Sequence, residues 1–81
     1  MTLSANLALI EQMLIDVGYP AEGHGEPASV TLADLGLDSL TLLELLMLVE
    51  ERAGIELRVE DVPMDSTLAD VATLIGQRQA R

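Results

Sequence analysis

Along this 81-residue chain, apolar residues recur at the three- and four-residue spacing of an amphipathic α-helix in three separate segments. In the first segment the spacing predicts a helix whose buried stripe consists of Leu3, Leu7, Ile10, Leu14 and Val17. Thr2 or Ser4 can cap the start of this helix, and Gly18-Tyr19-Pro20 stops it. Glycines and prolines from about Gly18 to Ser29 interrupt the periodicity, so this stretch is predicted to be a loop.

The second periodic segment predicts a helix from near Asp38 to about Ala53. Asp38 is a favourable N-cap because its carboxylate can accept hydrogen bonds from first-turn amides, and Gly54 is a common stop residue. The apolar residues just before this helix are expected to bring the loop back onto the core; they are Val30, Leu32, Leu35 and Leu37.

The third segment carries its apolar residues at Leu68, Val71, Ala72 and Ile75. Thr67 and Asp70 resemble a capping box at its start, while Gly76 weakens the helix, so residues from about 77 to 81 are expected to fray. Before this segment, an alternation of apolar residues ends at Pro63, which predicts at most a short turn of helix. Three main helices and one short helix predict a single all-α domain over residues 1–81.

The composition agrees with an aliphatic, helical core: 49% of the residues are hydrophobic, one is aromatic and none is cysteine. No disulfide or thiolate metal site can therefore stabilise the fold. The formal charge of −10, with no lysine, argues against nucleic acid or an anionic membrane as a partner, since both require a basic patch. The sequence shows neither a membrane-spanning stretch nor a secretory leader, so we expect a cytoplasmic monomer.

The second helix is too apolar for a small domain to bury on every side. At about 100° per residue, its core side consists of Leu42, Leu45, Leu46 and Val49. The opposite side carries an apolar ridge of Leu40, Leu43 and Met47, interleaved with Glu44, Glu50 and Glu51. An apolar ridge bordered by acids is typical of a surface that binds partner proteins. The alternative is that the loop before Asp38 covers the ridge.

Ser39 lies in the first turn of the second helix, at the N-terminal end of the ridge. A phosphate esterified to its hydroxyl would lie near first-turn amides and the positive end of the helix dipole, although a serine here is more often only a cap. Nucleophilic catalysis by Ser39 would need a base, and the single histidine, His24, lies in the loop. Glu60-Asp61 is interpreted as a solvated face and not as a metal site. We therefore expect neither an enzyme nor a metalloprotein.

The motif Asp34-Leu35-Gly36-Leu37-Asp38-Ser39-Leu40, followed by Glu44-Leu45 and Glu50-Glu51, resembles the attachment motif of acyl carrier proteins. The resemblance covers essentially the whole chain and implies a four-helix bundle. It also implies that a phosphopantetheinyl transferase moves 4′-phosphopantetheine from coenzyme A onto Ser39, and that the thiol of this arm holds acyl groups as thioesters. By position, it implies that basic partner surfaces are contacted by the acids Asp38, Glu44, Glu50 and Glu51, with Leu40 and Met47 as apolar contacts.

Three departures from the fatty-acid pattern favour a polyketide or other natural-product pathway, such as antibiotic biosynthesis, and the Met start without a flanking domain leads us to expect a free-standing carrier. Thr41 replaces a usual acid, Arg58 interrupts the acidic third segment, and lysine is absent. The expected partners are then acyltransferases, ketosynthases or other loading enzymes. Two alternatives stay open: an aminoacyl or peptidyl carrier with the same arm, and an unmodified acidic adaptor that docks through Leu40, Leu43 and Met47.

Overall fold

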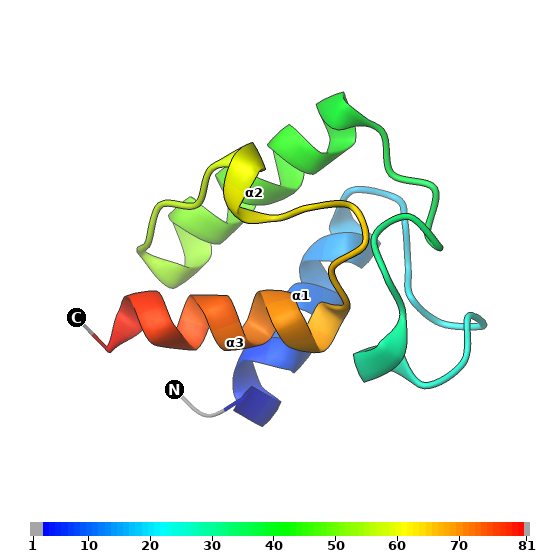
Figure 1. Ribbon diagram of the computed structural model, residues 1–81, viewed down its shortest axis with the longest axis horizontal. Helices are drawn as coiled ribbons and strands as arrows, with labels where there is room; N and C mark the ends of the chain where they lie inside the picture. The colour runs from blue at the N-terminus through cyan, green and yellow to red at the C-terminus, as the bar shows by residue number, and fades with distance from the viewer. Residues whose placement is uncertain (1–2, 81) are drawn as a thin grey trace.

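The computed structural model describes residues 3–80 and confirms an all-α fold. Its helices are α1 (Leu3–Asp16), α2 (Ser39–Ala53) and α3 (Leu68–Gln79), with single 3-10 turns η1 (Pro27–Ser29) and η2 (Val59–Asp61) in the connections. The predicted short third helix of the bundle is therefore the turn η2. In Figure 1, α1 passes behind α3, α2 lies above α3 in the view, and the long α1–α2 loop lies at the right. Within residues 3–80, no helix is long and apolar enough to cross a membrane.

The buried face of α1 differs in part from the predicted stripe. It consists of Asn6, Ile10, Met13 and Leu14, whereas Leu3 is exposed and Leu7 and Val17 are only half-buried. Asn6 is fully buried because it packs against α3 where Gly76 leaves room, and its Nδ2 atom donates a hydrogen bond to Gln79 Oε1 at 3.2 Å. Sequence periodicity could not place an asparagine in the core, since asparagine is normally a surface residue.

One of the two caps predicted for α1 is wrong. Ser4 lies inside the helix and is not its N-cap, and Thr2 lies outside the described residues. The other predicted caps are confirmed. Asp38 caps α2, Gly54 ends it in the left-handed conformation with φ of 72°, and Thr67 and Asp70 form a reciprocal capping box at the start of α3.

The α3 helix extends further than the sequence predicted. Residues 77–79 form its last turn, where fraying was expected. Two side chains of this turn contact other parts of the fold: Gln79 accepts the bond from Asn6, and Arg78 donates to the backbone oxygen of Glu56 at 3.3 Å. These tertiary contacts offset the low helix propensity of Gly76.

The loop before α2 is fixed by backbone pairing with the segment before α3. Leu68 N–H donates to Val30 O at 2.9 Å, Leu32 N–H to Ser66 O at 3.1 Å and Ala33 N–H to Met64 O at 2.8 Å. The side chains of this stretch are buried as predicted; they are Val30, Leu32, Leu35 and Leu37. The pairing itself had no signal in the sequence, because it involves an isolated bridge between Thr31 and Thr67 and no extended strand. It holds the chain immediately before Ser39 in place.

Candidate functional site

A compact turn directs the chain into the start of α2. Thr31 and Asp34 exchange hydrogen bonds, with Asp34 N–H donating to Thr31 Oγ1 at 3.0 Å and Thr31 N–H donating to Asp34 Oδ2 at 3.2 Å. Gly36 then reverses the chain with φ of 78°, and its N–H donates to Ala33 O at 3.0 Å. A residue with a side chain rarely adopts this left-handed conformation, which accounts for the glycine of the motif.

We expect Gly36→Ala to lower the free energy of unfolding by about 1–2 kcal/mol, because alanine is strained at this positive φ. Apart from Gly36 and its two chain neighbours, no atom lies within 4 Å of the position of an added Cβ, so the loss comes from backbone strain and not from a clash. Chemical denaturation of both chains measures the difference. Gly23→Ala is the comparison variant, because Gly23 has a similar positive φ of 90° and equally open surroundings, so the same strain predicts a similar loss. An unchanged stability in Gly36→Ala would contradict the argument.

Asp38 fixes the N-terminus of α2. Its backbone is extended, and its Oδ1 atom accepts a hydrogen bond from Thr41 N–H at 2.8 Å. This backbone bond first, and then a bond from the Thr41 side chain, hold the pKa of the Asp38 carboxyl below its ordinary value. Asp38 is therefore ionised at neutral pH, directly beside Ser39.

The lowered pKa of Asp38 predicts how the cap responds to acid. A carboxyl with a lower pKa in the folded than in the unfolded chain contributes stability above its unfolded pKa and loses it as pH falls through the folded pKa. We therefore expect Asp38→Ala to destabilise the protein at neutral pH and to become progressively closer to wild type below the ordinary pKa of 3.8. Urea unfolding of both chains across this pH range measures the gap. A gap that stays constant down to complete protonation would contradict the capping role.

Ser39 is the first residue of α2, and its side chain is exposed. Within residues 3–80, no described side chain forms a hydrogen bond with its hydroxyl, and no cluster of histidine, cysteine or acidic residues could hold a metal ion. His24 is exposed in the long loop. The site thus consists of an accessible hydroxyl at a helix N-terminus, with the Asp38 carboxylate as its neighbour in the chain. An accessible hydroxyl at this position fits a phosphate ester, because helix N-termini favour anions.

The two sides of α2 follow the predicted division. Leu42, Leu45, Leu46 and Val49 are buried, whereas Leu40, Leu43 and Met47 are 66%, 47% and 62% exposed. Glu44, Glu50 and Glu51 are exposed beside them. The alternative that the loop covers this ridge is therefore wrong: the loop packs on the core and against the segment before α3.

The structure adds η2 to this surface. Val59 is 43% exposed and faces the ridge across a groove of about 430 Å³ that is lined on the α2 side by Leu43, Leu46, Met47 and Glu50. The η2 side of the groove consists of Glu56, Leu57, Arg58, Val59 and Glu60. Sequence reasoning did not include Val59 or Arg58 in the site. The available signal was an apolar residue, Val59, placed between Arg58 and the acidic pair Glu60-Asp61.

Comparison with known proteins agrees with this geometry. Residues 10–75 match the family model described as a phosphopantetheine attachment site. The chain is 35% identical to an acyl carrier protein of Chlamydia caviae over 71 residues, which cover 88% of this chain and 86% of that protein. It is 34% identical to an acyl carrier protein of Chlamydia felis over 73 residues, which cover 90% of this chain and 87% of that protein.

Members of this family are carriers and not enzymes. They receive 4′-phosphopantetheine from a phosphopantetheinyl transferase and present acyl groups to acyl-handling enzymes. An exposed serine at the head of a helix with an exposed apolar ridge fits this role. The protein described here belongs to the acyl carrier protein family.

Proposed function

We propose that Ser39 is the residue to which 4′-phosphopantetheine is attached. The observation that carries this proposal is the combination of an exposed Ser39 hydroxyl with a fixed helix start, which Asp38 caps through the 2.8 Å bond from Thr41 N–H. The arm supplies a thiol, which this chain lacks, as the point at which an acyl group is held. The contribution of the chain itself is to present one hydroxyl in a fixed position beside the partner-facing ridge.

The ridge of Leu40, Leu43 and Met47 is the proposed docking surface for the enzymes that act on the arm. It begins one residue after Ser39, so an enzyme bound to it can reach the attachment point. Exposed acids flank the ridge, namely Glu44, Glu50 and Glu51. These charges favour partners with a basic surface and accelerate their association.

We expect Met47→Glu to lower kcat/KM for phosphopantetheinyl transfer by about tenfold or more, because it places a charge in the centre of an apolar contact. Met47 is 62% exposed, so the fold should be retained. Transfer from coenzyme A by a broad-specificity transferase provides the measurement. Ile15→Glu is the matched control, because Ile15 is a similarly exposed apolar residue on α1. Equal losses in the two variants would contradict a specific role for the ridge.

The proposed cargo is an acyl intermediate of the polyketide type, delivered by acyltransferases and extended by ketosynthases. Two features of the docking side support a partner set that differs from the fatty-acid one: Thr41 stands beside the ridge in the first turn of α2, and Arg58 places a cation on the η2 wall. The comparisons support an acyl carrier in general.

The experiment that tests the proposed function is the intact mass of the protein after incubation with coenzyme A, Mg²⁺ and a phosphopantetheinyl transferase. A gain of one phosphopantetheine is expected. Acyltransferases with malonyl- or acetyl-coenzyme A, and adenylating enzymes with ATP and amino acids, are then applied to the modified protein to identify the cargo class. Loading of aminoacyl groups alone would contradict the polyketide proposal and favour a peptidyl carrier, and a folded chain that gains no mass would favour an unmodified adaptor.

A further inference from the structure

The segment between α2 and α3 has little secondary structure of its own. Between Gly54 and Thr67 it contains only the three-residue turn η2. Leu57 and Val62 bury their side chains on either side of this turn, whereas Val59 is 43% exposed. A single 3-10 turn has poor intrinsic stability. Since this turn forms one wall of the groove beside the α2 ridge, its position has to be fixed by contacts from outside.

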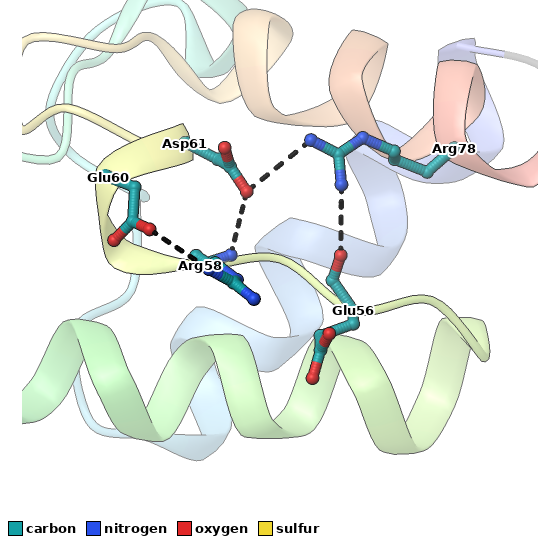
Figure 2. Close-up of polar contacts among 5 residues, drawn as sticks. All are labelled: Glu56, Arg58, Glu60, Asp61 and Arg78. Atoms are coloured by element: carbon teal, nitrogen blue, oxygen red, sulfur yellow. Dashed lines mark hydrogen bonds and ion pairs between the residues drawn. The ribbon is translucent and has the colours of Figure 1, made fainter.

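Arg78 of α3 makes such contacts at two points of the segment (Figure 2). Its Nη1 atom donates to the backbone oxygen of Glu56 at 3.3 Å, and its Nη2 atom lies 3.5 Å from Asp61 Oδ2. The same Asp61 oxygen accepts from the backbone N–H of Arg58 at 3.0 Å. One guanidinium thus joins Glu56, three positions before the turn, to Asp61, the last residue of the turn. The fixed fork geometry of arginine suits such a two-point contact.

This Arg78 contact is better shielded than the other ion pair of the segment. The side chains of Arg78 and Asp61 are 30% and 28% exposed, respectively. The pair between Arg58 and Glu60 is longer, at 3.7 Å, and both of its side chains are exposed. Exposed pairs of this kind contribute little to stability. Of the two ion pairs drawn in Figure 2, the one between Arg78 and Asp61 is therefore the better suited to restrain the turn, and the hydrogen bond from Arg78 to Glu56 adds a second point of contact.

We propose that Arg78 is a positioning residue for the η2 half of the docking surface. It lies on the α3 side of the segment, while the groove and the ridge lie on the α2 side, so it acts on the groove without lining it. By holding Glu56 and Asp61, it fixes the position of the turn relative to α2. The turn then presents Val59 opposite Leu43 and Met47. The part of this inference that concerns enzyme binding rests on the proposed function of the ridge.

Hydrogen exchange in the unmodified protein tests the restraint itself. In Arg78→Ala, the amides of Arg58, Asp61 and Val62, all hydrogen-bonded within the turn, are expected to exchange about tenfold faster than in wild type. Arg78→Lys should recover part of this protection. The lysine ammonium group can still bind one of the two acceptors, but it lacks the rigid fork with which the guanidinium binds both. If Arg78→Ala does not fold, Arg78→Lys alone is compared with wild type, and faster exchange in the turn is again expected.

The matched control is Arg52→Ala, which removes the 2.6 Å ion pair with Asp16 between α2 and α1 and leaves η2 untouched. Amides in the middle of α1 report on global stability in all variants. Equal acceleration in the turn and in α1, or the same acceleration in Arg52→Ala, would overturn the proposal, because Arg78 would then be only one of several general stabilising residues.

A kinetic measurement tests the consequence for enzyme binding. For phosphopantetheinyl transfer we expect Arg78→Ala to raise the KM for the carrier protein about fivefold, because the loosened turn must be ordered when the transferase binds. The kcat should be unchanged, because the variant does not alter Ser39. An unchanged KM, together with faster exchange in the turn, would overturn the assignment of η2 to the docking surface. Failure of wild type to be modified would instead contradict the proposed function, and the exchange result would stand independently of it.

Discussion

A chain with Ser39→Ala will gain no mass from coenzyme A and a phosphopantetheinyl transferase under conditions in which wild type gains one phosphopantetheine. The change removes a single hydroxyl from an exposed position. Transfer forms a bond between that oxygen and the phosphorus of the arm, breaks the pyrophosphate bond of coenzyme A, and releases adenosine 3′,5′-bisphosphate and the hydroxyl proton. Without the oxygen no product can form. The expected effect is complete loss of modification, which intact mass spectrometry detects directly.

The fold of Ser39→Ala should be retained, and this makes the loss interpretable. Alanine is the residue with the highest helix propensity, and the cap of α2 comes from Asp38 and not from Ser39. Circular dichroism and urea unfolding should therefore be close to wild type. Ser29→Ala is the matched control, because Ser29 is also exposed but lies in η1, away from the ridge. Full modification of Ser39→Ala, or loss of modification in Ser29→Ala, would contradict the assignment.

The features that sequence reasoning predicted correctly are those that depend on local pattern. The angular position of residues on a helix separated the buried Leu45 from the exposed Leu43. Local capping chemistry placed Asp38 and Thr67 at the starts of α2 and α3. A helix start is defined by residues close together in the chain, so a single sequence contains the information required.

The features that sequence reasoning missed depend on residues far apart in the chain. Asn6 is in the core because Gly76, on another helix, leaves space for it, and Gln79 supplies its hydrogen-bond partner. The two-point contact of Arg78 joins α3 to the segment around η2. Neither arrangement produces a periodic pattern. The long-range contacts of α3 also explain why it extends to Gln79, although Gly76 suggested an earlier end.

These two classes of information meet at the proposed docking surface. The α2 half follows from helical periodicity and carries Ser39 at its start. The η2 half depends on tertiary contacts, because Val59 belongs to a turn too short to hold its own position. The ridge could therefore be predicted from sequence, whereas the groove beside it could only be found once the packing of α3 was known.

Leu45→Ala should lower the free energy of unfolding by about 2–5 kcal/mol, whereas Leu43→Ala should change it by less than about 0.5 kcal/mol. Leu45 is 1% exposed and lies in the core cluster that joins all three helices, so its truncation leaves a cavity as well as losing buried apolar surface. A small domain has a total stability of only about 5–15 kcal/mol. The loss in Leu45→Ala is therefore a large part of what keeps the chain folded.

Leu43→Ala is a close control, because it makes the same chemical change in the same helix. The difference in helix propensity between leucine and alanine is common to both variants, so the gap between them reports burial alone. Urea unfolding followed by circular dichroism measures both free energies, and equal m-values would show that the unfolded states are comparable. Leu43 is 47% exposed in the structure. Similar losses of stability at the two positions would mean that Leu43 is instead buried in solution. A large loss at Leu45 with little loss at Leu43 would show that Leu43 faces solvent. This is what the proposed function requires of the ridge.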